Sequence, residues 1–409
     1  MTGSRAAIVS RNADRTCRPV CSRARATYAC EVASFAYLDH AATTPMLPES
    51  LRAMVETLAT SFGNPSGSHS ASRRARAALD EARDRVAAVL GAQAREVVFT
   101  SGGTEALNLA LGGAGGRGGM AWSAVEHDAV RNTVDALARS GRGRSIELPV
   151  GADGVLELDA AAVLLDESVS VVAVMAVNNE VGSVQPIAEL AQLVRRASPR
   201  AVLLVDAVQA LSWLDLRPIV AVSDLVAISA HKFGGPKGAG ALVIKEGVAI
   251  EPTVFGGGQE RDRRSGTQNV AGAVALGIAA EQTDRARARM VPYVAALRDR
   301  LVEGLVAAVS GLSETTPRAT KVAGNAHVCI EGVESEELLV LLDRAGVCAS
   351  AGSACASGAA HASPVLLAMG ISKERALGSL RLTLGVSSTD ADVDLALAAI
   401  PAAVERLRR

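Results

Sequence analysis

Short apolar runs alternate with stretches of helical periodicity through the middle of this chain, and this alternation limits the possible folds more than any other feature. Five such runs are Val97–Thr100, Val171–Val177, Ala201–Val205, Leu225–Ile228 and Ala241–Ile244. Strands that are buried on both faces have this continuous apolar character, because helices cover both sides of a parallel sheet. The pattern therefore predicts an α/β fold with a mainly parallel sheet.

Two segments carry the helical period. Between Ser70 and Leu90 apolar residues recur every three or four positions, and Gly91 follows as a stop signal. The segment Pro186–Ala197 is also helical and separates two of the predicted strands. The glycine-rich stretch Gly112–Gly119 lacks the Lys-Ser/Thr ending of a nucleotide-binding loop, so we interpret it as a flexible connection.

Composition excludes several classes of function. With 409 residues, 49% of them hydrophobic, most of the chain should fold, as one large domain and a smaller one. A net charge of −1 and an aromatic content of 2% do not suit a nucleic-acid binder. Because no apolar run approaches the roughly 20 residues that span a bilayer, we expect a soluble protein that binds neither membrane nor nucleic acid.

The first 34 residues contain six arginines and only two acidic residues. We expect this N-terminal extension (1–34) to be disordered, with a transit segment or an over-long start as alternatives. The six cysteines are Cys17, Cys21, Cys30, Cys329, Cys348 and Cys355. Their two distant groups do not form a compact disulfide framework, which favours a reducing, cytoplasmic location. No second pair or histidine cluster follows the first group, so we predict no metal site.

Polar residues follow directly after four of the predicted strands. They are Ser101–Thr104, Asn178 and Asn179, Asp206, and Ser229 with His231 and Lys232. In open α/β sheets, ligands bind outside the carboxyl ends of the strands. We therefore predict that these four strand ends frame one pocket.

Three of these groups specify a cofactor when taken together. The turn Ser101–Glu105 opens a helix, whose free amides and positive dipole end suit a phosphate, and Thr104 adds a hydroxyl. Lys232 is one of only five lysines, and a lysine amine in a pocket can lose its proton and form a Schiff base. Asp206 could pair with a protonated pyridine nitrogen. A lysine, an acid and a phosphate turn indicate pyridoxal 5'-phosphate.

A series of motifs then carries a resemblance from about Phe35 to the C-terminus. They are Tyr37–Pro45, Gly63–Ser66 with His69, Phe99–Glu105, Glu126–His127, Val177–Gly182, Asp206–Gln209, Ser229–Lys232, Gly256–Glu260, Arg264–Thr267 and Gly352–Cys355. In this order they resemble the cysteine desulfurases of the NifS/IscS type, in the class V aminotransferase-like group. His40 stands where asparagine is usual and Gln259 where histidine is common, and neither departure changes this interpretation.

The resemblance implies a fold-type I pyridoxal-phosphate enzyme with a mainly parallel seven-stranded sheet. Residues 51–290 would form the large cofactor-binding domain. Residues 291–409 would form a smaller α+β domain that carries the catalytic cysteine loop, and residues 35–50 would join this small domain. The resemblance also implies a homodimer.

It further implies a role for each matching residue. Cofactor contacts are implied for Lys232, Asp206, Gln209, Asn179, His127, Gly103, Thr104, Ser229, His231 and, from the partner subunit, Thr267. In this set Lys232 holds the cofactor as a Schiff base, Asp206 pairs with the ring nitrogen, and His127 stacks on the ring and moves protons. Arg381 would bind the substrate carboxylate together with Asn179, in the bidentate geometry that suits arginine.

Cys355 lies among small residues, from Ala349 to Gly358, and we expect a mobile loop there. The resemblance implies that its thiolate takes the sulfur of L-cysteine as a persulfide and that alanine is released. We interpret Cys329 and Cys348 as packing residues, because they lie in apolar runs.

Other readings remain open at this stage. A selenocysteine lyase or an aminotransferase of the same fold needs Lys232 and Asp206 but not Cys355. A sulfur-relay scaffold would leave the lysine and the acid without a purpose, and a nucleotide switch would need a different loop. The sulfur acceptor also stays open among an iron–sulfur scaffold, a tRNA-thiolation protein and a DNA-modification partner.

Overall fold

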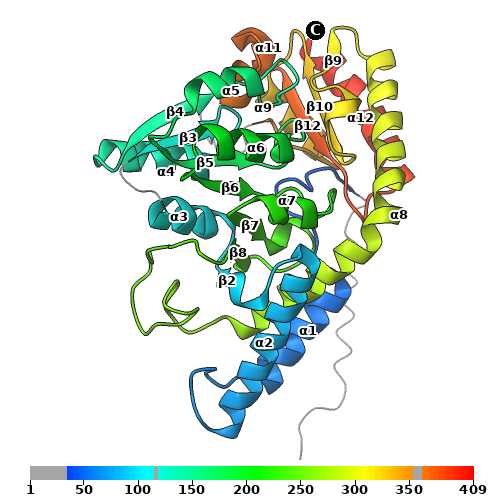
Figure 1. Ribbon diagram of the computed structural model, residues 1–409. Coiled ribbons are helices and arrows are strands. Elements are labelled where there is room, and N and C mark those ends of the chain that lie inside the picture. Colours follow the sequence, from blue (N-terminus) through cyan, green and yellow to red (C-terminus); the bar gives the residue numbers. More distant parts are fainter. Residues whose placement is uncertain (1–34, 115–117, 353–361) are drawn as a thin grey trace, which may run out of the picture. The chain divides into compact units, whose positions relative to one another are not determined.

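The computed structural model describes residues 35–114, 118–352 and 362–409 (Figure 1). The chain divides into two units, Met1–Ser34 and Phe35–Arg409, and the second is described here. Two predictions lie outside the described residues: the disorder of residues 1–34 and the mobile loop around Cys355. No described helix is both long and apolar enough to cross a membrane.

A seven-stranded sheet forms the centre of the unit. Its strands, in order across the sheet, are β2 (Val97–Thr100), β8 (Gly240–Ile244), β7 (Leu225–Ser229), β6 (Val202–Asp206), β5 (Val169–Met175), β3 (Gly119–Ser123) and β4 (Arg144–Leu148). Only β8 runs antiparallel to its neighbours, so the other six strands point the same way. The predicted mainly parallel, seven-stranded α/β fold is confirmed.

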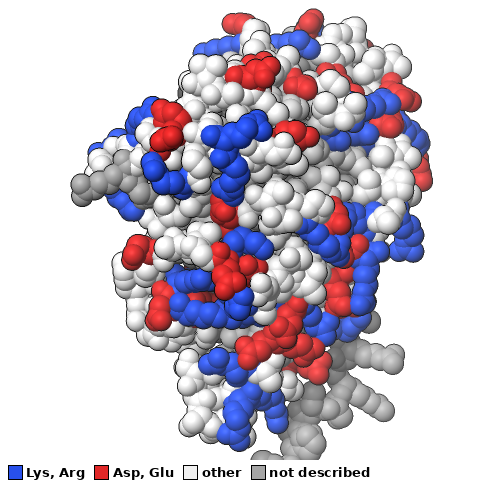
Figure 2. All heavy atoms as spheres, viewed as in Figure 1, with Lys and Arg blue, Asp and Glu red and all other residues white. Residues whose placement is uncertain are grey.

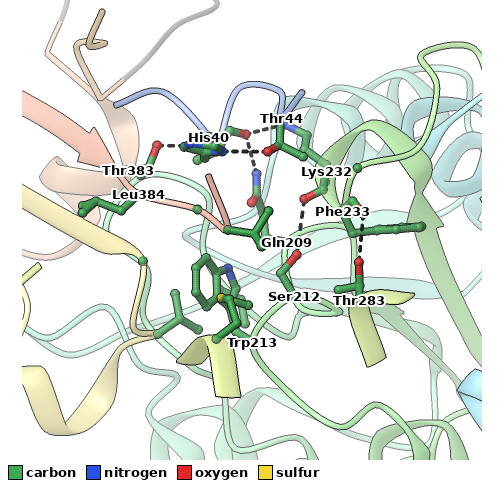
Figure 3. A pocket seen from close by; sticks show the side chains of 18 of the residues that line it. His40, Thr44, Gln209, Ser212, Trp213, Lys232, Phe233, Thr283, Thr383 and Leu384 are labelled. Atoms are coloured by element: carbon green, nitrogen blue, oxygen red, sulfur yellow. Dashed lines mark hydrogen bonds between the residues drawn. The ribbon is translucent and has the colours of Figure 1, made fainter. Parts of the chain in front are cut away.

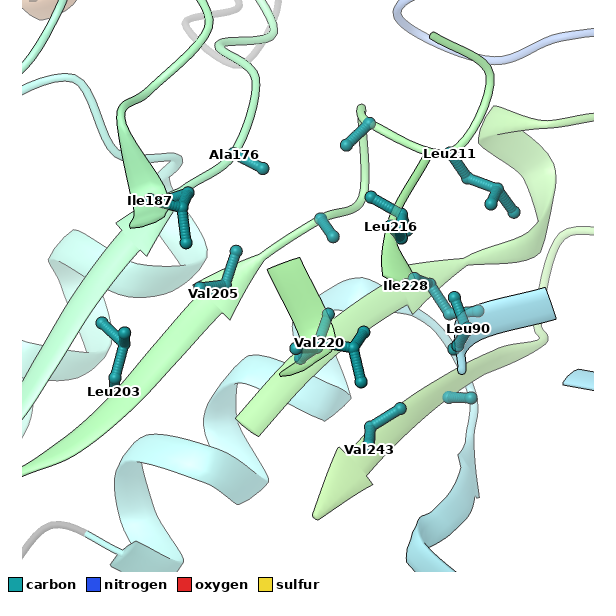
Figure 4. Packing of buried hydrophobic residues seen from close by; sticks show 14 of the residues in the cluster. Leu90, Ala176, Ile187, Leu203, Val205, Leu211, Leu216, Val220, Ile228 and Val243 are labelled. Atoms are coloured by element: carbon teal, nitrogen blue, oxygen red, sulfur yellow. The ribbon is translucent and has the colours of Figure 1, made fainter. Parts of the chain in front are cut away.

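Helices cover both faces of this sheet (Figure 1). On one face lie α3 (Gly103–Ala114) and α4 (Asp128–Arg139), whose apolar side chains pack on alternate residues of the strands. On the other face lie α2 (Ser70–Leu90), α5 (Leu158–Leu164), α6 (Ile187–Ala197), α7 (Arg217–Val222) and the first half of α8 (Val270–Ala308). Figure 4 shows this second face, where Leu203 and Val205 of β6 lie among side chains from the covering helices.

The helix predicted over Ser70–Leu90 has the predicted bounds. The His69 ring accepts the amide of Ser72 at its start, and Gly91 ends it in the left-handed conformation, with φ 65°. This capping satisfies amides and carbonyls that a helix end otherwise leaves unpaired. The helix predicted from Pro186 begins one residue later, at Ile187.

The prediction for Gly112–Gly119 is wrong at both ends. Gly112 and Gly113 belong to α3, and Gly119 opens β3. A side chain at residue 113 would place its Cβ 2.5 Å from the carbonyl oxygen of Glu251. The glycine there permits a close backbone contact within a helix, and it does not mark a loop.

A second core lies beside the first. A three-stranded antiparallel sheet holds β9 (Leu312–Glu314), β10 (Asn325–Ile330) and β12 (Ser379–Thr383), and β1 (Ala36–Tyr37) pairs with β11 (Val347–Cys348). The helices of this region are α9 (Ser335–Arg344), α10 (Pro364–Ala368), α11 (Lys373–Leu377) and α12 (Asp390–Leu407). Its buried cluster joins Ala36 and Leu38 to residues of 290–404.

The remaining elements are short or connect these parts. They are α1 (Pro48–Thr60) and three 3-10 turns, η1 (Ala94–Glu96), η2 (Ala230–Lys232) and η3 (Arg318–Thr320). Helix α8 has 39 residues and contains Pro292. Its first half packs in the core of the large sheet, and its second half packs in the second core.

Candidate functional site

The carboxyl ends of five strands meet around one cavity of about 300 Å³. Sequence reasoning identified the ends of β2, β5, β6 and β7. The fifth is the end of β3, which delivers Glu126 and His127. The predicted single pocket is therefore present, with one more strand contributing to it.

Lys232 and Asp206 both line this cavity. The Asp206 carboxylate ends β6, is 5% exposed, and accepts the amide of Val208 at 2.9 Å. Burial raises the pKa of Asp206, while the Val208 amide and the charges of His127 and Lys232 act in the opposite direction. The Lys232 amine donates to the carbonyl oxygens of Ala41 at 2.6 Å and Ala42 at 3.0 Å.

The other end of the cavity suits an anion. Gly103 and Thr104, at the N-terminus of α3, line it together with Ser229 and His231. Free amides at a helix N-terminus attract negative charge. Burial first, then Lys232 and Lys237, lowers the pKa of His231 to about 4. A neutral His231 therefore offers an N–H without the cost of a buried charge.

His127 caps α4, and this contact fixes its proton. Ring atom Nδ1 accepts the amide of Ala129 at 3.0 Å, so the hydrogen of the neutral imidazole resides on Nε2. His127 lines the cavity beside Asp206. The Nε2–H can therefore donate a hydrogen bond.

Glu126 is a carboxyl group that sequence reasoning did not assign to the site. Its Oε1 accepts the amide of Met175 at 2.6 Å, and its Oε2 is buried without a partner among the described residues. Burial, and then the charge of Asp206, raises the pKa of Glu126 well above its ordinary value. A carboxyl group whose neutral form is favoured by burial thus lines the same cavity as Asp206. The Glu126–His127 pair was visible in the sequence, but nothing there indicated burial.

Arg381 lies in β12 and reaches the same cavity. It donates from Nη1 to the Asn179 carbonyl oxygen at 3.1 Å and from Nη2 to Asp39 at 2.8 Å. Its Nε is buried without a partner among the described residues. Asn179 lines the cavity as well, and Gln209 does so while donating to the Ala41 carbonyl at 2.7 Å.

Two further predicted residues are Thr267 and Cys355. Thr267 is exposed and is not among the residues that line the cavity of its own chain. Cys355 lies outside the described residues. Gly352, three positions earlier, does line the cavity.

Residues 36–396 match the Aminotransferase class-V family. The chain belongs to this family. An IscS-like cysteine desulfurase of Mycobacterium tuberculosis is 42% identical over 391 residues, which cover 91% of this chain and 97% of that protein.

Two solved structures are also similar to this class-V chain. A NifS-like protein has a TM-score of 0.86 and 32% identity, over 91% of this chain and 100% of that one. SspA in complex with cysteine has a TM-score of 0.76 and 28% identity, over 86% and 99%.

Class-V aminotransferases of the NifS type depend on pyridoxal phosphate, and the cavity fits that group. The N-terminus of α3 and neutral His231 suit its phosphate, buried Asp206 suits its protonated ring nitrogen, and the Lys232 amine suits its aldehyde. The close packing at the phosphate end is visible at Gly103, where a Cβ would meet Val208 at 2.7 Å.

Proposed function

We propose that this chain is a pyridoxal-phosphate-dependent cysteine desulfurase that converts L-cysteine to L-alanine and takes the sulfur on Cys355 as a persulfide. One observation carries the proposal: Lys232, Asp206 and Arg381, from three elements distant in sequence, line one cavity. The likeness to known cysteine desulfurases supports the reaction. When bound, the cofactor supplies an aldehyde and an electron sink for the substrate carbon.

Lys232 is the proposed base for the α-proton of the substrate. Its amine lies beside two backbone carbonyls, which hold it in the cavity. The two carbonyl oxygens, at 2.6 and 3.0 Å, orient the amine. This support within the cavity favours Lys232 as the group that would take the proton of a bound substrate.

Arg381 is the proposed site of the substrate carboxylate, with Asn179 beside it. Asp39 and the Asn179 carbonyl fix the guanidinium at the wall of the cavity. Since guanidinium–carboxylate pairing is directional, this contact would orient the substrate. The bound cysteine in the SspA structure supports an amino acid with a thiol as the substrate.

His127 is the proposed partner of the substrate sulfur, through Nε2. The amide of Ala129 keeps Nδ1 occupied, so the neutral ring holds its hydrogen on Nε2. This N–H would donate a hydrogen bond to the sulfur and stabilise negative charge on it. His127 is also the residue proposed to stack on the cofactor ring.

Cys355 is the proposed nucleophile. Its thiolate forms a bond to the substrate sulfur as the carbon–sulfur bond breaks, and the carbon keeps the electron pair and then gains a proton. The described cysteines are poorer candidates, because burial raises the pKa of both Cys329 and Cys348.

The variant Cys355→Ser tests this assignment. It should bind the cofactor and change its visible spectrum on addition of L-cysteine, because Lys232, Asp206 and Arg381 are intact. Sulfide release under reductant, and labelling of the chain by substrate sulfur, should fall to background. Cys329→Ser and Cys348→Ser are matched controls and should retain both. Production of alanine and sulfide at the normal rate by Cys355→Ser would overturn the persulfide and favour a lyase.

A second copy of the chain is the partner we propose next. Four large apolar side chains on and just after α1 are between 50% and 78% exposed: Leu51, Val55, Leu58 and Phe62. Their spacing places them on one side of the helix, as an apolar stripe that a single chain leaves uncovered. Thr267, which is exposed and does not line its own cavity, would then reach the phosphate of the partner's cofactor.

The proposal also covers the two domains, the sulfur acceptor and the location of the protein. Residues 51–290 and 291–409 act as a large and a small domain, since two separate buried clusters correspond to them. The persulfide passes to an acceptor protein, such as an iron–sulfur scaffold or a thiolation protein. A cytoplasmic location remains a prediction from the cysteine spacing.

On the face seen in Figure 2, acidic and basic side chains are interspersed, and no groove lined by basic side chains alone, as nucleic acid would need, is visible.

A further inference from the structure

An outer cavity of about 410 Å³ adjoins the phosphate end of the first cavity. The two cavities share Gly103, Thr104, Ser229 and His231, the four residues that suit the cofactor phosphate and that we call the phosphate cup. The outer cavity is lined by Lys237 as well, which the first cavity is not. A charged group there would therefore act on a phosphate held in the cup.

The connection between β7 and β8 brings Lys237 to this outer cavity. The amide of Ala230 donates to the Ala239 carbonyl at 3.0 Å, so the connection leaves the sheet and returns to it at one point. Between these ends, the hydroxyl of Thr283 donates to the Phe233 carbonyl at 2.9 Å, as Figure 3 shows. Hydrogen bonds thus fix the backbone on both sides of Lys237, while its side chain is exposed.

The phosphate cup itself supplies little positive charge. A phosphate monoester carries about two negative charges near pH 7, whereas a helix N-terminus offers about half a positive charge. Thr104 and Ser229 contribute uncharged hydroxyl groups. Burial is the main cause that lowers the pKa of His231 to about 4, so this ring is neutral near pH 7. The four residues of the cup therefore leave most of the phosphate charge unbalanced.

Lys237 is the cation that can supply the missing charge. Of the described residues that line the outer cavity, it is the one lysine or arginine. Its charge also helps to lower the pKa of His231, which indicates that the ammonium lies near that ring. Within the part of the chain that the structure describes, no ion pair joins Lys237 to a carboxylate. Its charge is therefore available to an anion in the cup.

Glu105 places a carboxylate in the same outer cavity, and Arg264 balances it. The guanidinium of Arg264 donates from Nε to Oε1 at 2.7 Å and from Nη2 to Oε2 at 3.2 Å. Oε2 also accepts the amide of Ser101 at 2.8 Å. Since both oxygens are engaged in this bidentate pair, the carboxylate charge is offset where it arises. The pair leaves Lys237 as the charge that a phosphate would meet.

We propose that Lys237 is a further cofactor-binding residue, whose ammonium pairs with the phosphate of pyridoxal phosphate from the outer cavity. This inference rests on pyridoxal phosphate as the group bound in the first cavity. A lysine suits the position, because its ammonium is a compact charge on a flexible stem that can reach a phosphate from an exposed loop. Since Lys232 serves the aldehyde and Asp206 the ring nitrogen, Lys237 acts on the phosphate alone.

Titration of the full-length apoenzyme with pyridoxal 5'-phosphate and with pyridoxal tests this role, with the Schiff-base absorption band as the signal. Lys237→Gln should bind the phosphate form about fivefold more weakly, a typical effect for an exposed ion pair. It should bind pyridoxal within about twofold of the unmodified chain, because pyridoxal has no phosphate. Unchanged affinity for the phosphate form, or equal weakening of both compounds, would overturn the inference. Failure of the unmodified chain to bind the phosphate form would contradict the proposed function as well.

Salt and a conservative variant separate the charge of Lys237 from its shape. Because salt at about 1 M screens exposed charges beyond about 3 Å, the loss in Lys237→Gln should shrink to within about twofold there. Lys237→Arg keeps the charge and should stay within about twofold at low salt. Lys373→Gln is the matched control, since Lys373 is exposed on α11 and lines neither cavity, and it should change nothing. A loss that persists at high salt, or that Lys237→Arg or Lys373→Gln shares, would overturn the inference.

Discussion

Three histidines of the described chain are wholly or partly buried, and burial keeps them neutral near pH 7. Burial is the main cause that lowers the pKa of His40 and His231 to about 4 and that of His327 to about 3. A histidine in the unfolded chain titrates near 6.5. Between pH 6.5 and 3 the unfolded chain therefore binds more protons than the folded one, and the free energy of unfolding falls as pH falls.

His327 gives this effect in its simplest form, because it is fully buried in β10. We expect His327→Asn to lose less stability than the unmodified chain between pH 7 and pH 5. The difference should approach about 1.4 kcal/mol per pH unit below pH 6. Thermal unfolding at pH 7, 6 and 5 measures it. The raised pKa values of Glu126 and Glu180 increase the free energy of unfolding as pH falls. This effect is the same in His327→Asn and in the unmodified chain, so it cancels in the comparison. Parallel pH profiles would contradict the prediction.

Single residues were predictable where chemistry depends on residue type and chain position. Lys232 and Asp206 follow strands, and no other side chains suit an aldehyde and a pyridine nitrogen so well. Glu126 and Glu180 were not predicted as site residues. Burial raises the pKa of both carboxyl groups, and the sequence does not show which acidic residues are buried. Glu180 accepts from Ser363 at 2.5 Å, a contact across 183 positions that no local pattern reveals.

At the scale of elements, the sequence predicted which segments are strands and helices better than where they end. The run Val171–Val177 corresponds to β5, Val169–Met175. Ala176 and Val177 are buried as well, so hydrophobicity alone could not show that the strand had ended. Strands β3 and β4 were not predicted at all. β4 is an edge strand that contains two charged residues and two exposed positions at its start, so it lacks a continuous apolar run.

The turn between β2 and α3 joins two parts of the proposed cofactor site. A Cβ on Gly103 would meet Val208 Cγ2 at 2.7 Å, and the amide of Val208 holds Asp206. We expect Gly103→Ala to displace Val208 and to weaken pyridoxal-phosphate binding about tenfold, in the range of overpacking effects. Fluorescence titration of the apoenzyme with the cofactor measures this.

The double variant Gly103→Ala/Val208→Ala is the control for this contact. Removing the valine methyl groups takes away the atom that the new Cβ meets. The double variant should therefore bind the cofactor more tightly than Gly103→Ala alone, which is the non-additivity expected of touching residues. Additive losses would show that the effect of Gly103→Ala does not arise from this contact.

At the scale of the whole molecule, the loop between β8 and α8 is held in an unusual conformation. Glu260, Arg261 and Asp262 all have positive φ, of 48°, 58° and 63°. Such a backbone costs free energy and persists only where surrounding contacts fix it. Here Glu260 forms a buried bidentate pair with Arg83, at 2.7 and 2.8 Å, and accepts the Phe99 amide. The loop is thereby held in place, and it carries Thr267 outward.

The proposed role of Thr267 cannot be seen in a single chain, because Thr267 does not line the cavity of its own chain. Its motif was recognisable in the sequence, but its proposed ligand belongs to another subunit. The described chain leaves it exposed, as it leaves the apolar stripe of α1. A second copy would account for both features together. The dimer is therefore best tested through a site that two chains must share.

Mixed dimers make that test. Lys232→Ala removes the amine from one cavity, and Thr267→Glu would place a carboxylate against the phosphate of the cavity that Thr267 serves. Each variant alone should be inactive. If Thr267 serves the partner, a mixed dimer has one cavity with both defects and one with neither. Since random mixing makes about half of the dimers mixed, unfolding and refolding the two together should restore about a quarter of the desulfurase activity.

Mixing Lys232→Ala with Arg381→Ala is the control and should restore none, because both residues line the same cavity of one chain. No recovery in the first mixture would place Thr267 in its own subunit's site, and a monomer by light scattering that keeps full activity would exclude the shared site altogether.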